Sequence, residues 1–402
     1  MGRTYYGYRI VAASCVIQMM YLGGMFSYGV FFPELEAEFG WSRATISGAS
    51  SLMFLVMGVL GILLGKMNDV LGPRILLTAS TALFAVGYML MSRMTTVWEL
   101  YLFYGMLAGI GIGAHDVATL STVARWFVRY RGLMSGMVKT GAGIGQLIGP
   151  LAAGILVNAY GWRQACLFMG LFMLASLVLV SQVMRRDPAE MGLSPLGGGD
   201  EGTVKSGEAE SGLNLTEALK TRPFQILCLA KLCDFYCLLS VITHIVPYGI
   251  DQGLEPATAV SILSAIGGSS IIGRLLLGTA FDRLGTRRSL LICFTLLLIS
   301  LVIIQTVSDP RILFLFAPIY GIGHGGFFAV ASPSVADYFG TRSHGTLFGF
   351  LLFSGALGGT AGPVFTGMIF DLHGSYDIAF LILTGFALLG FLLTCVLKPL
   401  SI

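Results

Sequence analysis

Residues 65–74 read GKMNDVLGPR and residues 278–287 read GTAFDRLGTR, so glycine, aspartate, glycine and arginine recur in both segments at matching places. The offset between the segments is 213 residues, because 278 minus 65 is 213. The same offset relates further glycines and a Gly-Pro pair, with Gly132, Gly136, Gly149-Pro150, Gly154 and Gly161 matching Gly345, Gly349, Gly362-Pro363, Gly367 and Gly374. One constant offset over so many positions indicates two homologous halves.

The composition around this repeat is typical of a membrane protein. Of the 402 residues, 55% are hydrophobic and 11% are charged, whereas an ordinary soluble domain carries about 25% charged residues. A transmembrane helix needs about 20 mostly apolar residues. The chain has twelve such runs, at 8–32, 43–66, 74–93, 97–124, 132–157, 163–184, 223–249, 257–280, 288–307, 311–336, 343–370 and 376–398. We therefore predict an all-α integral membrane protein with twelve transmembrane helices in two pseudo-symmetric six-helix bundles.

The domain boundaries follow from the one long polar stretch between the halves. We expect an N-terminal six-helix bundle over 1–186, a cytosolic linker over 187–221 and a C-terminal six-helix bundle over 222–402. Six helices in each half give both halves the same orientation, so the repeat is parallel. Parallel halves predict a substrate site between them near the middle of the membrane.

The orientation follows from lysines and arginines in the short loops, because these are enriched on the cytosolic side. Seventeen of them fall on the side that holds both termini: Arg3, Arg9, Lys66, Arg74, Arg125, Arg129, Arg131, Arg185, Arg186, Lys205, Lys220, Arg222, Arg283, Arg287, Arg288, Arg342 and Lys398. Four fall on the other side: Arg43, Arg93, Arg163 and Arg311. We predict a multi-pass protein of the plasma or inner membrane, with both termini and the linker in the cytosol.

Two repeated motifs predict moving parts. Asp69 and Arg74 in the first turn, and Asp282 and Arg287 in the second, are expected to form a conformational latch rather than a plain hairpin with cytosolic arginines. The Gly-Pro pairs Gly149, Pro150, Gly362 and Pro363 lie inside apolar spans. Small residues let helices approach closely, and proline removes a backbone hydrogen bond and kinks the helix. We expect these residues to be structural, flexing elements and not ligand contacts.

An arginine lies within the eighth apolar run. Arg274 is eight residues before Asp282, roughly 12 Å along a helix at 1.5 Å per residue. The alternative to a functional role is a side chain that reaches the nearer membrane face. The residue 213 positions earlier is Gly61, so the fold of the first half has no cation at this depth. An ionisable residue inside a membrane indicates a functional site.

Together these features resemble the major facilitator superfamily over nearly the whole chain. A narrower resemblance is to its monocarboxylate porter and oxalate–formate antiporter branch, in a bacterial form, and rests on Tyr6-Gly7-Tyr8, Phe31-Phe32-Pro33-Glu34-Leu35, Phe39-Gly40-Trp41-Ser42-Arg43, His244-Ile245-Val246-Pro247-Tyr248 and Arg274. The resemblance implies that Arg274 binds the substrate carboxylate. This chain has Ser270 where the animal carriers have an aspartate, Gly355 where the oxalate exchanger has a lysine, and Phe26 in place of a lysine. The lack of a second cation favours a substrate with one carboxylate.

Further polar residues lie within the apolar runs. Those expected to bind substrate are Arg274, Tyr320, His115, Tyr28 and Tyr236, and those expected to couple protons are Asp234, Asp116, His244 and Lys139. Each has a simpler alternative. Lys231 and Asp234 share a helical face and can form an ion pair within one helix. Lys139 can pair with Asp116 or reach the membrane face. His115 and Asp116 can be satisfied by hydrogen bonds with each other and with spans one and five. His244, near the membrane interface, can bond a loop carbonyl.

The function predicted is proton-coupled symport of a small monocarboxylate, such as L-lactate or pyruvate, by alternating access. The alternatives are an anion exchanger for dicarboxylates or oxalate-like acids, and a proton-driven exporter of another organic compound. The expected partners are a small organic anion, protons and the lipid bilayer, with the chain acting as a monomer. No nucleophile–base spacing and no metal-ligand cluster is present, so we predict no enzyme activity, no cofactor, no metal and no nucleic-acid binding.

Overall fold

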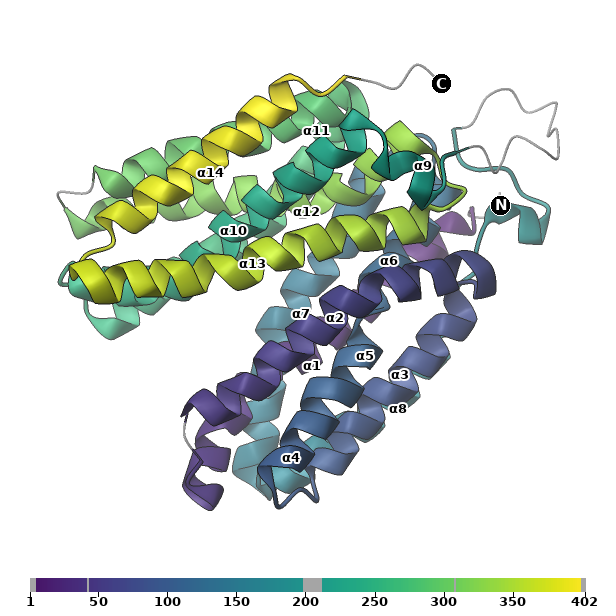
Figure 1. Ribbon diagram of the computed structural model, residues 1–402. Coiled ribbons are helices and arrows are strands. Elements are labelled where there is room, and N and C mark those ends of the chain that lie inside the picture. The colour runs from purple at the N-terminus through teal and green to yellow at the C-terminus, as the bar shows by residue number, and fades with distance from the viewer. Residues whose placement is uncertain (1–4, 42, 198–211, 307–308, 399–402) are drawn as a thin grey trace. The chain divides into compact units, whose positions relative to one another are not determined.

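The computed structural model describes residues 5–41, 43–197, 212–306 and 309–398, which are almost entirely helical (Figure 1). The helices of the first half are α1 (Gly7–Phe39), α2 (Arg43–Leu71), α3 (Pro73–Met91), α4 (Val97–Leu100), η1 (Tyr101–Ala108), α5 (Gly109–Ile112), α6 (His115–Trp126), α7 (Arg131–Tyr160) and α8 (Trp162–Ser181). The remainder are η2 (Pro188–Met191), α9 (Leu215–Leu219), α10 (Arg222–Asp251), α11 (Pro256–Gln305), η3 (Pro310–Ile312), α12 (Leu313–Phe339), α13 (His344–His373) and α14 (Asp377–Cys395). Arg3, Lys205 and linker residues 198–211 lie outside the described residues.

Among the described residues, eleven helical runs are long and apolar enough to cross a membrane. One of them, Ser261–Gln305, has 45 residues, which would extend roughly 68 Å at 1.5 Å per residue, over twice the ~30 Å hydrocarbon core. Gly285 lies inside this run with φ 74° and ψ 177°, so the backbone turns there and the run forms two crossing segments. The predicted all-helical fold with twelve crossing segments is confirmed.

The same turn occurs once in each half. Gly72 has φ 80° and ψ 165°, close to the values of Gly285, and it precedes α3. A positive φ is costly for residues with a Cβ, so glycine is required where the chain reverses between crossings. Pro73 occupies the first turn of α3, where its fixed φ suits a helix start. The repeated glycine of the sequence motif is therefore the turning point of both hairpins.

The chain divides into two compact units. Unit 1 comprises Met1–Arg129, Met137–Glu210 and Thr341–Gly349. Unit 2 comprises Tyr130–Gly136, Ser211–Gly340 and Phe350–Ile402. Each unit thus includes the first turns of a helix that continues in the other, α13 for unit 1 and α7 for unit 2. The predicted boundaries at 186 and 222 stay a prediction.

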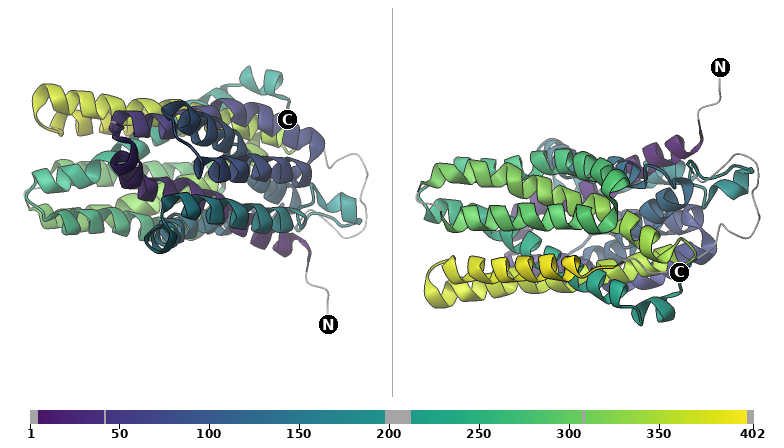
Figure 2. Two further views of the ribbon diagram at one scale, coloured as in Figure 1. Left: turned by 90° about the horizontal axis from the view of Figure 1, so that it is seen from below. Right: turned by 90° about the horizontal axis from the view of Figure 1, so that it is seen from above.

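Within unit 1, α3 packs along α8, and α1 contacts α6 and α8. Within unit 2, α11 runs beside α12, and α14 packs on both α10 and α11, as Figure 2 shows from two further directions. The short helix α9 precedes α10 and begins with Asn214 and Glu217, whose side chains each accept a hydrogen bond from the other residue's backbone amide.

Close glycine contacts join equivalent helices in both units. In unit 1, a Cβ added to Gly145 or Gly149 of α7 would overlap the carbonyl oxygens of Met19 and Gly23 in α1. In unit 2, Gly358 and Gly362 of α13 stand in the same relation to the carbonyls of Leu232 and Tyr236 in α10. All four pairs obey the 213-residue offset, so the repeated glycines mark one conserved packing contact, made twice. Pro150 and Pro363 follow directly, inside their helices.

The fourth crossing, predicted as one span over 97–124, is broken in the structure. It runs from Val97 to Trp126 and contains a π-helical stretch, η1, and a turn at Gly113 and Ala114. The turn restarts the helix at His115, so Asp116 lies in the first turn of α6. A negative side chain is favourable there because the helix dipole is positive at that end.

Candidate functional site

Unit 1 holds a buried polar cluster around Asp116. The ammonium of Lys139, on α7, donates to Asp116 Oδ1, and Gln18 Nε2, on α1, donates to the same oxygen over 2.7 Å. Gln18 also reaches Thr119 Oγ1 at 3.0 Å. The Lys139 and Asp116 side chains are only 6% and 14% exposed. Three helices therefore converge on one carboxylate, and the pairing of Lys139 with Asp116 that the sequence left open is present.

His115 flanks this cluster. Its Nδ1 lies 2.6 Å from the carbonyl oxygen of Ile112, and its Nε2 lies 3.6 Å from Asp116 Oδ1. A carbonyl only accepts hydrogen bonds, so Nδ1 carries a proton and Nε2 faces the carboxylate. A proton added to Nε2 would meet a negative charge at once. The arrangement can hold a proton between His115 and Asp116.

Unit 2 holds a second buried cluster, on α10. Lys231 Nζ lies 2.8 Å from Asp234 Oδ2, and the two side chains are 6% and 2% exposed. The ammonium also lies 4.3 Å from the ring centre of Phe235 and 5.3 Å from that of Phe328. Aromatic faces attract cations, more strongly away from water. The ion pair within one helix, considered from the sequence, is therefore present and lies against two aromatic rings.

Arg274 belongs to the same surroundings. It is buried on α11, and its Cζ lies 5.6 Å from the ring centre of Phe328 on α12. His324 lies one turn earlier on α12, with its ring centre 5.1 Å from that of Phe328. Its Nδ1 is buried and has no hydrogen-bond partner in the described part of the chain. Two cations thus approach one aromatic ring, beside a single carboxylate, Asp234.

The two clusters occupy equivalent places in the repeat. An offset of 213 relates Gln18 to Lys231, Tyr21 to Asp234, Gly61 to Arg274 and His115 to Phe328. Unit 1 places its charges on α6 and α7, whereas unit 2 places them on α10 and α11. The two units share a fold and differ in their buried charges, which therefore are not needed to build that fold.

The tyrosines predicted as substrate contacts each have a place in the packing. The Tyr320 hydroxyl donates to the carbonyl of Leu238 over 3.1 Å, and the Tyr28 hydroxyl donates to the carbonyl of Ile46 over 2.7 Å. Tyr236 stacks on Phe386 with ring centres 4.0 Å apart. It lines an open groove of about 350 Å³ between α10, α13 and α14, together with Leu232, Leu357, Gly358, Ala361, Phe365 and Phe386.

His244 joins α10 to the kinked part of α13. Its Nε2 lies 3.0 Å from the carbonyl oxygen of Pro363, and its Nδ1 lies 3.1 Å from the Tyr376 hydroxyl. Burial raises the pKa of Tyr376, so the phenol keeps its proton and donates to Nδ1. The Nε2 proton then points at the proline carbonyl. His244 therefore bonds a backbone carbonyl, as in the alternative considered from the sequence. Its proton-coupling role stays a prediction.

The repeated turns make matching contacts. Asp69 accepts from the backbone amides of Gly345 and Thr346 at 3.0 and 2.9 Å, within unit 1. Asp282 accepts from those of Gly132 and Leu133 at 2.8 and 2.9 Å, within unit 2. Each aspartate thus caps the start of a helix, α13 or α7, whose orphan amides need an acceptor. Arg74 and Arg287 also match, bonding Gln182 and the carbonyl of Cys395, which are 213 residues apart.

Helical crossings, an internal repeat and buried charges within the crossing helices are typical of a membrane transporter. The chain belongs to the Major Facilitator Superfamily, whose family model matches residues 14–304 and 262–401. It is 27% identical over 389 residues to monocarboxylate transporter 13 of Bos taurus, covering 96% of this chain and 88% of that one. It is also 27% identical over 390 residues to the MFS transporter asaE of Aspergillus flavus, covering 95% and 84%.

Solved structures share the fold. The crystal structure of the MFS transporter FucP in the outward conformation superposes with a TM-score of 0.75 at 13% identity, covering 97% of this chain and 99% of that one. The resemblance to the superfamily, with monocarboxylate transporters among the relatives, is confirmed. The family and these relatives are transporters, so the chain is a transporter and not an enzyme.

Sequence reasoning missed three participants. Gln18 and Phe328 were not singled out, and Lys231 was considered only as a partner of Asp234. The offset of 213 pairs Gln18 with Lys231 and was the available signal for both. Phe328 is an aromatic residue in an apolar helix, which is ordinary, and its one signal was the same offset, which pairs it with His115. The seven cysteines are all free, five of them buried and two half-buried.

Proposed function

We propose that this transporter carries a small organic anion with one carboxylate, such as L-lactate or pyruvate, together with a proton. The observation that supports the proposal most is Arg274, a buried guanidinium on a membrane-crossing helix, whose counterpart in the repeat is glycine. A guanidinium offers a planar pair of donors that matches a carboxylate. Monocarboxylate transporter 13 among the relatives points to the same substrate class.

The charges of unit 2 support an anionic substrate. Lys231 and Asp234 balance each other, and Arg274 adds one positive charge to the same surroundings. A carboxylate bound to Arg274 would make charge-assisted hydrogen bonds with the guanidinium, so the loaded carrier would be stabilised relative to the empty one. Differential stabilisation of this kind is what lets substrate drive a change of state.

Two carboxylates are the proposed proton carriers, Asp234 in unit 2 and Asp116 in unit 1, with His115 beside the second. Each already lies against a lysine, so protonation breaks an ion pair and changes the local balance of charge. His244, at the other end of α10, is the candidate for proton exchange with the medium because an imidazole can both accept and donate a proton. Tyr320, Tyr28 and Tyr236 are proposed to shape the path beside these groups.

The capped turns are proposed as the parts that open and close. Asp69 and Asp282 hold helix starts through two amide hydrogen bonds each, which can break and re-form without unfolding a helix. The glycine contacts at Gly149 and Gly362 allow α7 and α13 to bend at the prolines that follow. We also propose, from the loop charges, that both termini and the linker are cytosolic, and that the chain acts as a monomer in the cell membrane.

The test is uptake by the purified full chain in proteoliposomes under an imposed pH gradient. We expect lactate and pyruvate to accumulate with the gradient, and Arg274→Ala to lower uptake at least tenfold. Arg311→Ala is the matched control, because that arginine is exposed and lies outside the buried cluster. Uptake that does not change with the gradient would contradict proton coupling. Uptake by Arg274→Ala equal to that of the wild type would contradict the role of Arg274 in binding.

A second candidate function is proton-driven export of a larger apolar compound. The groove of about 350 Å³ beside Tyr236 favours it, because its lining is almost wholly apolar. Export of this kind would survive the loss of Arg274 and would fail when the groove is filled, for example by Ala361→Trp. The two variants therefore separate the two functions in one assay.

A further inference from the structure

We propose that Lys231 is a second substrate-binding residue, made available when Asp234 takes up a proton, and that it holds the second oxygen function of a short bifunctional acid. The first carboxylate of that acid lies on Arg274, so the inference rests on the proposed function and deepens it. The second oxygen function is a keto or hydroxyl oxygen; an acid with a second carboxylate enters only as a probe in the test below.

The geometry places both cations on one aromatic side chain. Lys231 Nζ and Arg274 Cζ lie 5.3 and 5.6 Å from the ring centre of Phe328. The ammonium and the guanidinium are therefore separated by no more than the total of these two distances. That total is an upper limit, reached only if the ring centre lies on the line between the two cations. A short acid, with a hydrogen bond of about 2.8 Å at each end, joins the two cations where they lie within this limit on one side of the ring.

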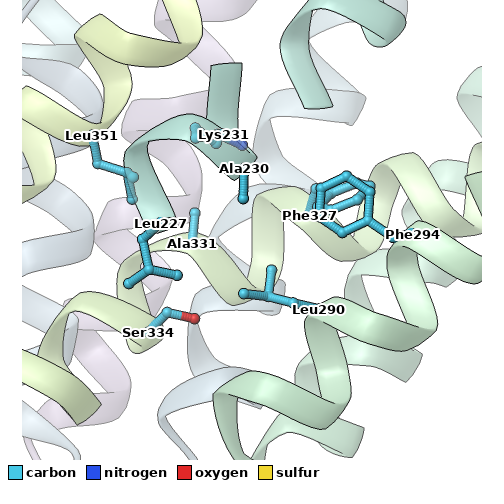
Figure 3. Close-up of a pocket in the computed structure, with 9 residues that line it drawn as sticks. All are labelled: Leu227, Ala230, Lys231, Leu290, Phe294, Phe327, Ala331, Ser334 and Leu351. Carbon is cyan, nitrogen blue, oxygen red and sulfur yellow. The ribbon is translucent and has the colours of Figure 1, made fainter. Parts of the chain in front are cut away.

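Aromatic neighbours stabilise the Lys231 ammonium independently of Asp234. The ring centre of Phe235 lies 4.3 Å from its ammonium. Its side chain also has room to move, since it lines a cavity of about 20 Å³, enough for one water, with apolar neighbours and Ser334 (Figure 3). On α13, Gly355 leaves space at the stem, because a Cβ there would lie 3.3 Å from Lys231 Cγ. Lys231 on α10 therefore places a cation beside Gly355, the position of α13 where the oxalate exchanger has a lysine.

The fold does not account for this ion pair. A buried ion pair contributes little net stability compared with apolar residues of similar size. Unit 1 builds the equivalent helix with Gln18 and Tyr21 at the matching positions, both neutral. A lysine and an aspartate placed beside the proposed carboxylate-binding arginine therefore point to recognition of a charged or polar ligand.

The groups around the pair determine its response to pH. Those near enough to interact electrostatically with it are Cys233 and Cys237 on α10, Cys293 on α11, and Tyr320 and His324 on α12, with Arg274 beyond Phe328. Asp234 is the one carboxylate among these described neighbours. Protonation of Asp234 removes a negative charge from the surroundings of Lys231 and Arg274. The site then suits an acid with two oxygen functions better than a simple acid.

The test compares propionate, lactate, pyruvate and succinate in proteoliposomes holding the full chain, at pH 5.5 and pH 7.5. We expect the preference for the bifunctional acids over propionate to grow at the lower pH. Lys231→Gln, which installs the residue of the equivalent position in unit 1, should lower uptake of the bifunctional acids about tenfold and leave propionate within about twofold. Asp234→Asn should keep the preference at both pH values. Ser334→Ala, beside the same cavity, is the control and should change neither the uptake of the acids nor the preference among them.

The outcomes separate this inference from the proposed function. If Lys231→Gln lowers all four acids equally, or changes none, the inference is wrong while transport through Arg274 stands. If the wild type takes up none of the acids, or Arg274→Ala takes them up normally, both the inference and the proposed function are wrong. If either single variant does not fold, the double variant Lys231→Gln with Asp234→Asn removes both charges together and must lose the preference; a retained preference overturns the inference.

Discussion

Asp69 Oδ1 lies 2.8 Å from Arg125 Nη2, and both side chains are about nine-tenths buried. Arg125 also donates to the carbonyl of Thr341, so one arginine holds both the turn and the chain that leads into α13. Asp282 makes the same amide contacts as Asp69, yet the position that matches Arg125 is Tyr338. The two repeated turns therefore share the pair of amide hydrogen bonds. The turn at Asp69 has in addition a hydrogen bond from the Thr346 hydroxyl and the positive charge of Arg125.

This asymmetry predicts different costs for the same substitution. Asp69→Asn removes the carboxylate from a buried arginine, so we expect a loss of about 3 kcal/mol or more. Asp282→Asn replaces a charged acceptor of two amide hydrogen bonds with a neutral one, so we expect a loss of stability of about 1–2 kcal/mol. The midpoint of thermal denaturation of the purified protein measures both. Adding Arg125→Gln to Asp69→Asn should recover part of the loss, and equal shifts for the two aspartates would contradict the assignment.

The glycine contact between α1 and α7 predicts a position-specific effect of a single methyl group. Gly149→Ala places a Cβ onto the carbonyl oxygen of Gly23, so we expect destabilisation of about 1–3 kcal/mol and slower transport. Gly154→Ala, on the same helix, meets nothing within 4 Å and should be neutral or slightly stabilising. Thermal denaturation and uptake rates of the two variants, measured side by side, test this contact. Similar behaviour of both would show that it is not tight.

The Asp116–Lys139 pair predicts strong coupling between two substitutions. Asp116→Asn or Lys139→Gln alone leaves the other charge buried without its main partner, so each should cost about 3 kcal/mol. The double variant should cost less than the sum of the two, because no unbalanced charge remains. A thermal double-mutant cycle gives the coupling, and additive losses would show that the pair does not interact. Uptake measured from pH 5.5 to 7.5 on the double variant tells whether this cluster carries the transported proton.

Substitution of Arg274 by lysine separates charge from shape. Arg274→Lys keeps the positive charge and loses the planar pair of donors. We expect the KM for lactate to rise about tenfold with the maximal rate little changed, since one charge-assisted hydrogen bond is lost. Arg311→Lys is the matched control. An unchanged KM would mean that the carboxylate does not bind the guanidinium in two places.

Much of the fold was predictable because its determinants are local. Each crossing is an uninterrupted apolar run, and each hairpin needs a glycine at positive φ, so the pattern 213 residues apart located both. The break at Gly113 and Ala114 was not predictable, because the run around it is as apolar as its neighbours. The restart of the helix at His115 depends on how α5 packs against α2 and α3.

Site contacts were less predictable, because they join residues far apart in the sequence. Pairing of Lys231 with Asp234 could be anticipated, since residues three apart share a helical face. The contact of Lys231 with Gly355 could not, because it depends on how closely α10 and α13 approach. For the same reason the sequence indicated that a cation is lacking at Gly355, whereas the structure places Lys231 of α10 beside that glycine.

The sequence by itself determined the membrane class, the twelve crossings, the parallel repeat and the family, all of which follow from hydrophobic length and from glycines that no other residue replaces. The tertiary structure alone decided which charges meet. It placed Gln18 and Lys139 on one carboxylate, and Lys231 and Arg274 on one aromatic ring. The physical reason is that a buried charge must find its partner in three dimensions, and helix packing brings together side chains that no spacing along the chain relates.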